Sequence, residues 1–418
     1  MVLSSARAPL TEPNTNLSFL IDFAPGALSD LAPVFNLFML RSALAHSAGR
    51  SLSRPSDGGR PASLHQKYSP QSASDCFEQA LIVTVEPQRS FRVYFTPPKP
   101  SHTLTKTPVC SFSHPPVVFV FHHGAGYSAL SAACFAKEVR SQSNGEFGVL
   151  SFDCRGHGSS QVGSIQPADL SLLTLANDLV DLLRTMYPNR QQAPAFVLIG
   201  HSMGGAVVTE ACASIQAQVG RVLGLVVLDV VEGTAMSSLA SMMPLVESRP
   251  SKFSSQAECI KYHIDSHTIR NLASACISVP GIVKKCSSPV TDDPPADSTS
   301  EHESPQNEYF TWVTDLRSSQ PYWEGWYSGL SKKFLSQRTA RLLVLAGADR
   351  LDKELIIGQM QGKYQLSVLA NVGHCIHEDD PEKLAEIVIT FAQRNDTMGS
   401  EEILARLGKK PFVPSTPL

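Results

Sequence analysis

The sequence predicts an α/β protein built on a mostly parallel central sheet flanked by helices. Short apolar runs rich in Val, Leu and Ile recur along the chain, which is typical of parallel strands buried on both faces. These runs occupy residues 117–121, 147–152, 195–199, 222–228, 341–346 and 365–370. Amphipathic helical patterns separate most of them, and strands that alternate with helices indicate βαβ units.

The bulk composition fits a globular protein and excludes some partners. Among the 418 residues, 42% are hydrophobic and 17% are charged, so the length allows one large domain or two ordinary ones. A net charge of -3 gives no general attraction to nucleic acid or to an anionic membrane. The nine cysteines are odd in number and form no CxxC pair, which favours free thiols in a reducing compartment.

The first 66 residues are expected to be a disordered arm. Residues 17–40 are apolar but contain two aspartates and two prolines, so they make a poor bilayer span. From Met39 the chain is rich in Arg and Ser, for which a mitochondrial transit peptide is an alternative to a disordered basic arm. The sequence leaves open whether Met1 or Met39 is the true start.

The folded domain is expected over residues 67–395, with a tail at 396–418. It begins with two β-rich runs at 80–86 and 90–96, which predict an antiparallel hairpin. A linker dense in Pro, Ser and Thr follows, and then the apolar runs begin. Apolar residues at i, i+3, i+4 and i+7 predict helices at 128–142, 174–187 and 381–394, and after Ser202.

The alternation of strands and helices is interrupted once, between residues 234 and 338. This stretch has helical and irregular patterns, a Trp/Tyr-rich segment at 320–330 and no convincing strand. Within it, residues 286–308 are acidic, rich in Pro and Ser and nearly devoid of apolar residues, so a disordered loop is expected. An insertion before the penultimate strand lies over the carboxyl ends of the strands, where ligands bind, which predicts a cap.

The segment Gly200-His201-Ser202-Met203-Gly204 follows one strand directly and opens a helix. A serine on such a corner must adopt a strained backbone, and small flanking residues prevent clashes. The corner presents the serine Oγ at the top of the sheet, and the N-terminus of the helix favours negative charge there. We therefore expect an α/β-hydrolase fold with Ser202 as the nucleophile.

A serine hydroxyl needs a base, and in this topology the base follows the last strand. His374 lies just past that strand, and His377 is the alternative, nearer the final helix. An acid must orient the base. Asp229 and Asp349 each follow a late strand; topology alone favours Asp349, and Asp352 is a weaker candidate better suited to capping a helix.

The backbone N–H groups of Met203 and Ala125 are expected to form the oxyanion hole, since one follows the nucleophile and the other lies in the glycine loop after residues 117–121. Asp153 and His157 lie in a glycine-rich turn and are interpreted as structural, and His201 as a packing residue. No spacing of His, Cys or Asp matches a metal site, and no cofactor is expected.

Several longer segments narrow the family. They read LGLVVLDVVEGTAMSSL, TWVTDL, YWEGWYSGLSKKFLS, LLVLAGADRLDKELIIGQMQGKYQ and VGHCIHEDDPEKLAE. Together they closely resemble the protein phosphatase methylesterases over residues 68–396, apart from the acidic loop. The resemblance implies a serine esterase that removes the methyl ester from the C-terminal leucine of the type 2A protein phosphatase catalytic subunit, in the cytoplasm or nucleus.

Carried over by position, the resemblance implies Ser202 as nucleophile, His374 as base and Asp229, rather than Asp349, as acid. Two alternatives remain open. One is a small-molecule carboxylesterase or lipase on the same scaffold; the other is a phosphatase-binding scaffold whose site is vestigial.

Overall fold

The computed structural model describes residues 64–99, 115–162, 168–287, 308–347 and 351–396. Its first helix, α2 (Leu64–Lys67), begins three residues inside the predicted N-terminal arm. The described residues leave out most of that arm, nearly all of the acidic loop and nearly all of the C-terminal tail. Asp349 also lies outside them. Within the described part, no helix is long and apolar enough to cross a bilayer.

The predicted central sheet is confirmed, and each apolar run of the sequence forms one of its strands. An antiparallel hairpin of β1 (Gln79–Glu86) and β2 (Arg89–Thr96) leads into it. The remaining strands run parallel to one another, in the spatial order β4 (Phe147–Phe152), β3 (Val117–His122), β6 (Ala195–His201), β7 (Val222–Leu228), β10 (Ala340–Leu345) and β11 (Gln365–Val368). The two-residue strand β5 (Gln161–Val162) pairs with β2.

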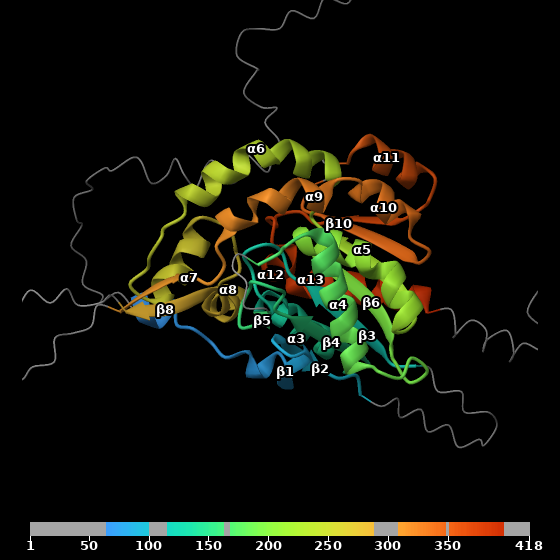
Figure 1. Ribbon diagram of the computed structural model, residues 1–418, viewed down its shortest axis with the longest axis horizontal. Coiled ribbons are helices and arrows are strands. Elements are labelled where there is room, and N and C mark those ends of the chain that lie inside the picture. Colours follow the sequence, from blue (N-terminus) through green and yellow to red (C-terminus); the bar gives the residue numbers. More distant parts are fainter. Residues whose placement is uncertain (1–63, 100–114, 163–167, 288–307, 348–350, 397–418) are drawn as a thin grey trace, which may run out of the picture.

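Helices cover both faces of this sheet (Figure 1). On one face, α4 (Leu172–Met186) and α5 (Met203–Gln218) pack their apolar sides into a single hydrophobic cluster with the strands. On the other face, α3 (Ala133–Gln142) and α13 (Pro381–Asn395) do the same. Each fully buried Leu, Val or Phe contributes roughly 1.5–3 kcal/mol of hydrophobic free energy, so the central strands carry much of the fold's stability.

The insertion between β7 and β10 forms the predicted cap, but its secondary structure differs from the expectation in one respect. It contains the helices α6 (Glu232–Ser248), α7 (Gln256–Asp265), α8 (Leu272–Ser278), α9 (Trp323–Tyr327) and α10 (Leu330–Ser336), the 3₁₀ turns η3 (Val279–Ile282) and η4 (Leu316–Tyr322), and the strands β8 (Val283–Ser287) and β9 (Glu308–Trp312). The expectation of no strand was wrong, because β8 and β9 form an antiparallel hairpin. The two strands read VKKCS and EYFTW, which contain no continuous apolar run long enough to predict a strand.

The cap is attached to the domain through its own core residues. Helix α9 lies between α6 and the sheet domain, and α10 lies beside it below α11 (Lys353–Met360) (Figure 1). Trp326 and Phe334 are buried in the same cluster as the side chains of α4 and α5. The Trp326 indole N–H donates to the Leu170 carbonyl over 2.7 Å, which satisfies its polar atom. Cap and sheet domain therefore share one hydrophobic core on this face.

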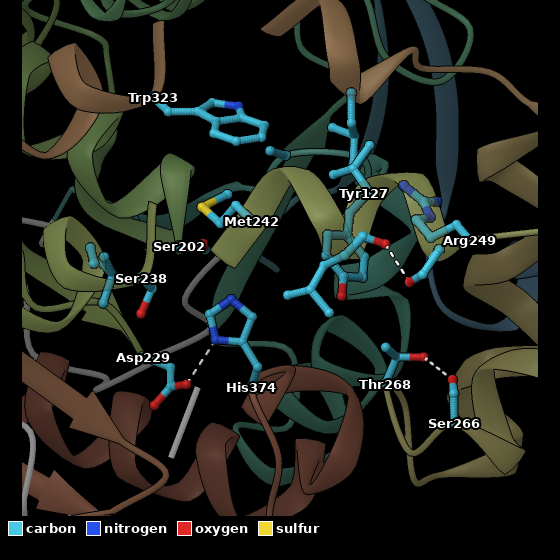
Figure 2. Close-up of a pocket in the computed structure, with 18 of the residues that line it drawn as sticks. Tyr127, Ser202, Asp229, Ser238, Met242, Arg249, Ser266, Thr268, Trp323 and His374 are labelled. Atoms are coloured by element: carbon cyan, nitrogen blue, oxygen red, sulfur yellow. Dashed lines mark hydrogen bonds and ion pairs between the residues drawn. The ribbon is translucent and has the colours of Figure 1, made fainter. Parts of the chain in front are cut away.

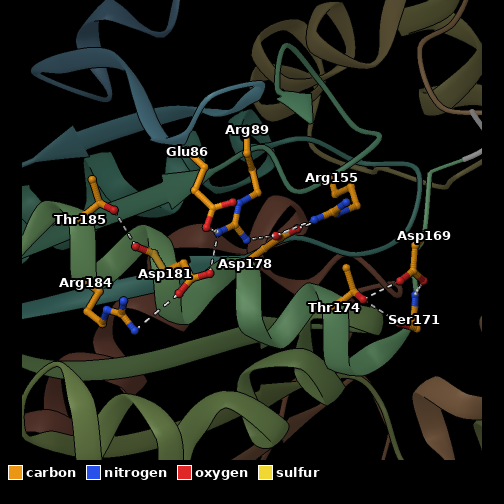
Figure 3. Close-up of polar contacts among 10 residues, drawn as sticks. All are labelled: Glu86, Arg89, Arg155, Asp169, Ser171, Thr174, Asp178, Asp181, Arg184 and Thr185. Carbon is orange, nitrogen blue, oxygen red and sulfur yellow. Dashed lines mark hydrogen bonds and ion pairs between the residues drawn. The ribbon is translucent and has the colours of Figure 1, made fainter. Parts of the chain in front are cut away.

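A buried ion-pair cluster fixes the turn after β4 against α4 (Figure 3). The Asp178 carboxylate is 1% exposed and accepts hydrogen bonds from Arg89, on β2, and from Arg155, in the turn. Arg89 also donates to Asp181 over 2.7 Å. Removing one partner from such a buried group costs about 3–5 kcal/mol, so this cluster holds the turn at residues 153–157 in place.

Candidate active site

Ser202 lies between the end of β6 and the start of α5 in a strained conformation, with φ 53° and ψ -120°. Two glycines allow this corner. A Cβ on Gly200 would lie 2.1 Å from the Gly204 carbonyl oxygen, and a Cβ on Gly204 would lie 2.2 Å from the His122 carbonyl oxygen. A non-glycine residue at positive φ costs about 1–3 kcal/mol, and the Ser202 N–H to Leu228 carbonyl bond (3.1 Å) helps to hold it.

His374 and Asp229 form a hydrogen-bonded pair in the same pocket as Ser202 (Figure 2). The distance from His374 Nδ1 to Asp229 Oδ2 is 2.8 Å. Because an ionised carboxylate only accepts, Nδ1 carries the proton, and in a neutral ring Nε2 is then an acceptor. The acid and the base of the expected triad are therefore hydrogen-bonded to each other, and Ser202 lines the same pocket.

The Asp229 side chain is fixed from both sides. The residue is 2% exposed and has a positive φ of 50°. Its N–H donates to the Val344 carbonyl over 2.8 Å, and its Oδ1 accepts from the Ala346 N–H over 2.9 Å. The turn after β7 is thus attached to the end of β10, and only Oδ2 is directed to His374.

The loop that carries His374 is held by two residues on which sequence reasoning placed little weight. His201, interpreted as a packing residue, is fully buried, and its Nε2 lies 3.0 Å from the His374 carbonyl oxygen. Asp379 Oδ2 accepts from the Gly373 N–H over 2.6 Å. Asp379 Oδ1 accepts from the Arg270 N–H in the cap over 2.7 Å, so this carboxylate connects the base loop with the cap.

The two alternative residues that the structure describes lie elsewhere. His377 is fully buried, with its ring 4.9 Å from that of Phe121 and 4.5 Å from that of His201, and burial lowers its pKa to about 3. Asp352 caps helix α11 (Lys353–Met360), since its Oδ1 accepts from the Leu355 N–H over 2.9 Å. Neither contributes to the pocket that contains Ser202.

The loop after β3 brings backbone N–H groups to Ser202. A Cβ on Gly124 would lie 3.3 Å from the Ser202 Cβ, so this loop passes directly beside the serine. The Gly126 N–H is used by His157 Nε2 at 2.9 Å. Among the hydrogen bonds of the described residues, neither the Ala125 N–H nor the Met203 N–H has a protein acceptor. These two donors are available for an oxyanion.

The turn at residues 153–157 supports that loop, in agreement with its structural interpretation. His157 Nδ1 lies 2.9 Å from the Arg155 carbonyl, which makes Nε2 the acceptor for Gly126. Burial lowers the pKa of His157 to about 4, so the ring is neutral at pH 7. The Asp153 carboxylate accepts from the N–H groups of Ala129 and Ser159, and burial raises its pKa to about 6.

The pocket lies under α6, with the side chains of the cap over Ser202 and His374. Tyr327 is 4% exposed and lines the pocket together with Ser202. Burial raises the pKa of Tyr327 to about 12, against a smaller lowering effect of the Ser202 side chain. Trp323 lines the pocket, whereas Trp326 is buried in the core. Apolar residues form most of the remaining wall: Val230, Val231, Ala235, Met242, Leu245, Val246 and Leu316.

No group of three or more His, Cys, Asp or Glu side chains in the described ranges is arranged to hold a metal ion. Ser202 beside the pair of His374 and Asp229 has the residue types needed for attack by an activated hydroxyl on a carbonyl carbon, with backbone donors for the developing oxyanion.

Comparisons with known proteins indicate the family of the chain. Residues 117–387 match the model of the alpha/beta hydrolase family. A protein phosphatase methylesterase 1 of Cryptococcus neoformans var. neoformans serotype D is 44% identical over 345 residues, which cover 79% of either chain. A relative of the same name from Aspergillus fumigatus is 43% identical, covering 78% of this chain and 72% of its own.

Among solved structures, an E-2-(acetamidomethylene)succinate hydrolase superposes with a TM-score of 0.53 at 16% identity, over 75% of this chain and 99% of the other. That likeness concerns the fold alone.

Proposed function

The chain belongs to the protein phosphatase methylesterases within the alpha/beta hydrolase family, and from this premise we propose that it demethylates the type 2A protein phosphatase catalytic subunit. The substrate is the methyl ester of that subunit's C-terminal leucine. The relatives described above are protein phosphatase methylesterases, which supports the reaction class. The hydrogen bond from His374 to Asp229, in one pocket with Ser202, is the observation that carries the mechanism.

In the proposed reaction Ser202 Oγ attacks the leucyl carbonyl carbon while His374 Nε2 takes the hydroxyl proton. Negative charge then develops on the carbonyl oxygen, where the N–H groups of Ala125 and Met203 stabilise it. The tetrahedral intermediate collapses, the bond to the methoxy oxygen breaks, and His374 returns the proton so that methanol leaves. A water molecule, deprotonated by His374, cleaves the acyl-enzyme and releases the leucine carboxylate together with free Ser202.

Asp229 acts through His374 in this scheme. Its carboxylate keeps the Nδ1 tautomer and stabilises the imidazolium that forms at each proton transfer. A methyl ester needs protonation of its leaving oxygen and a stabilised oxyanion, and both are available from protein groups. No metal or cofactor takes part in any step.

The experiment measures methanol release from the carboxymethylated phosphatase catalytic subunit by wild type, Ser202→Ala and Ser336→Ala. Ser336 is an exposed serine of α10 whose hydroxyl donates to the Lys333 carbonyl, so its variant controls for the loss of a hydroxyl away from the site. We expect release by wild type and Ser336→Ala, and none by Ser202→Ala.

Two outcomes contradict the proposal. Turnover of short acyl esters without release from the methylated phosphatase would favour a small-molecule carboxylesterase. Tight binding of the phosphatase with no release from any ester would favour a scaffold with a vestigial site.

A further inference from the structure

Arg249 is a positively charged side chain in the wall of an otherwise largely apolar pocket. It caps the C-terminus of α6 and lines the pocket that contains Ser202 and His374. Figure 2 shows Arg249 on the other side of the pocket from the pair of His374 and Asp229. The residue is half-buried, and its guanidinium lies 3.6 Å from the centroid of the Trp312 ring.

The position of Arg249 is fixed by that ring. The Trp312 indole N–H donates to the carbonyl of Pro250, the next residue after Arg249, over 2.7 Å. Phe253 packs edge-on against Trp312 with ring centroids 5.3 Å apart. An arginine stacked on an aromatic face keeps the edge of its guanidinium, and hence its N–H donors, free for a planar acceptor.

The Arg249 guanidinium has no counterion among the residues that the structure describes. Among the described residues, no Asp or Glu lies within ion-pair distance of Arg249, and no hydrogen bond from its side chain reaches a protein acceptor. Burial lowers the pKa of Arg249, which reports the loss of water around the guanidinium. A partly desolvated charge without a partner is costly, and proteins keep such groups mainly where a ligand supplies the opposite charge.

Further polar groups surround Arg249 at this end of the pocket. Tyr262, His263 and Thr268 all line it. His263 is 5% exposed, its Nδ1 lies 3.0 Å from Thr268 Oγ1, and its Nε2 has no hydrogen-bond partner. The wall therefore holds a buried polar atom, His263 Nε2, that no described protein group satisfies, beside the Arg249 guanidinium.

We propose that Arg249, together with Tyr262 and His263, forms a subsite that binds an acidic side chain of the substrate polypeptide, upstream of the esterified C-terminal residue. This inference rests on the proposed function and concerns which tails the enzyme accepts. The guanidinium and the carboxylate meet as a bidentate pair. The apolar wall of the same pocket, which includes Met242 and Trp323, takes the intervening residues of the tail.

A carboxylate fits better than other groups. The subsite presents one guanidinium and neutral donors, which match a single negative charge. Arg249 lies across the pocket from His374 (Figure 2), and an extended chain advances only about 3.3 Å per residue, so we place the acidic residue upstream of the esterified residue and not on it. Arg249 is thus assigned a role in specificity and not in the chemical step.

The test uses peptide methyl esters that end in leucine and carry one aspartate, moved stepwise from the first to the fifth position before the ester. Each peptide has a partner with asparagine at the same place. The measured quantity is the ratio of kcat/KM for each Asp/Asn pair, which does not depend on the active fraction of the enzyme. We expect one position at which wild type favours aspartate by about tenfold to a hundredfold, mainly through KM, because a charged hydrogen-bonded pair contributes roughly that factor.

Three variants locate the effect. Arg249→Met should remove the preference, and Arg249→Lys should restore part of it, since lysine keeps the charge but not the bidentate geometry. Arg317→Met serves as the matched control, because Arg317 is an exposed arginine of η4 next to the pocket residue Leu316. It should keep the wild-type ratio, which excludes general electrostatic attraction.

The inference is overturned if the ratio is near one at all five positions in wild type, or if Arg249→Met keeps the preference. Failure of the proposed function gives a different result, since wild type would then release no methanol from the asparagine peptides or from the methylated phosphatase.

Discussion

Replacing Asp229 by asparagine tests the catalytic geometry most directly, because the protein itself determines how the new side chain must sit. In the wild type, Oδ1 accepts from the Ala346 N–H and Oδ2 accepts from His374 Nδ1. An asparagine has one oxygen and one NH₂ group. The Ala346 N–H can bond only to the oxygen, so the NH₂ group faces His374.

Two donors cannot bond to each other, and the histidine must respond. His374 meets the NH₂ group by moving its proton from Nδ1 to Nε2, so that Nδ1 becomes the acceptor. A protonated Nε2 cannot take the hydroxyl proton of Ser202. The substitution thus leaves the shape of the site intact but holds His374 in the Nε2-protonated tautomer, which cannot act as the base.

The expected loss is about 10⁴-fold in kcat, as for the same substitution in another Ser-His-Asp enzyme, which corresponds to about 5.5 kcal/mol of transition-state stabilisation. KM should change little, since neither residue 229 nor the tautomer of His374 is proposed to bind the ground state. The assay is methanol release from a leucine methyl ester peptide, with thermal unfolding of each variant to verify the fold.

Two further aspartates serve as comparisons. Asp352→Asn keeps a good helix cap on α11 and should retain wild-type kcat within about threefold. Asp349→Asn examines the other late-strand acid of the sequence and should likewise remain active. If Asp229→Asn keeps kcat within tenfold while Asp349→Asn loses several orders of magnitude, the assignment of the orienting acid is refuted.

Three more predictions follow from the surroundings of the site. Gly200→Ala should abolish esterase activity and lower Tm, because the new Cβ would lie 2.1 Å from the Gly204 carbonyl oxygen. Such overpacking costs about 1–3 kcal/mol or more. An active variant with unchanged Tm would contradict this account of the turn at Ser202. Tyr327→Phe should lower kcat by about three- to tenfold with KM unchanged, because it removes a buried hydroxyl that lines the pocket with Ser202 and interacts with its side chain. Steady-state kinetics measures both constants. Acid should destabilise the protein below pH 6.5, because His122 and His157 have pKa values of about 4 and His263 and His377 of about 3 when folded; unfolding by guanidinium at pH 7.5 and 5.5 should show the loss.

The sign of the last effect follows from proton linkage. A histidine whose folded pKa is depressed binds its proton first in the unfolded chain, so stability is complete above pH 6.5 and is lost as the pH falls toward the folded value. Each such histidine contributes about 1.4 kcal/mol per pH unit in that window. Asp153 has the opposite effect on the free energy of unfolding. Because its folded pKa is raised to about 6 from 3.8, it stabilises the folded state as the pH falls from 6 to 3.8. Equal guanidinium midpoints at pH 7.5 and 5.5 would contradict the prediction.

Much of the fold could be predicted from the sequence because buried parallel strands leave a strong local signal. Six apolar runs correspond to the six strands from β3 to β11 that form the parallel part of the sheet. The hairpin of β8 and β9 was missed for a physical reason. Lys284, Lys285 and Glu308 point polar groups to solvent, and the pairing of the strands depends on residues far apart in the chain.

The site divides in a similar way. Ser202 has a local motif, and the glycines around it explain its geometry. The choice between Asp229 and Asp349 depends on how two neighbouring turns approach one loop, and topology alone favoured the other residue. The bonds from His201 and Asp379 to the loop of His374 have no sequence signature, since each joins a side chain to a backbone group. Arg249 has no sequence signature either, because an arginine before a proline is common. Only the structure shows that no Asp or Glu of the described residues pairs with it.

The burial of Trp326 and Phe334 in the core of the sheet domain has a consequence for how the molecule comes apart. A cap that folds by itself could be removed, exchanged or unfolded separately. Here the aromatic side chains of the cap complete the apolar layer over α4 and α5, so displacement of the cap would expose that layer to water. Heating should therefore give one cooperative calorimetric transition for the sheet domain and the cap together. A variant from which the cap is deleted should aggregate and should not be a smaller active esterase.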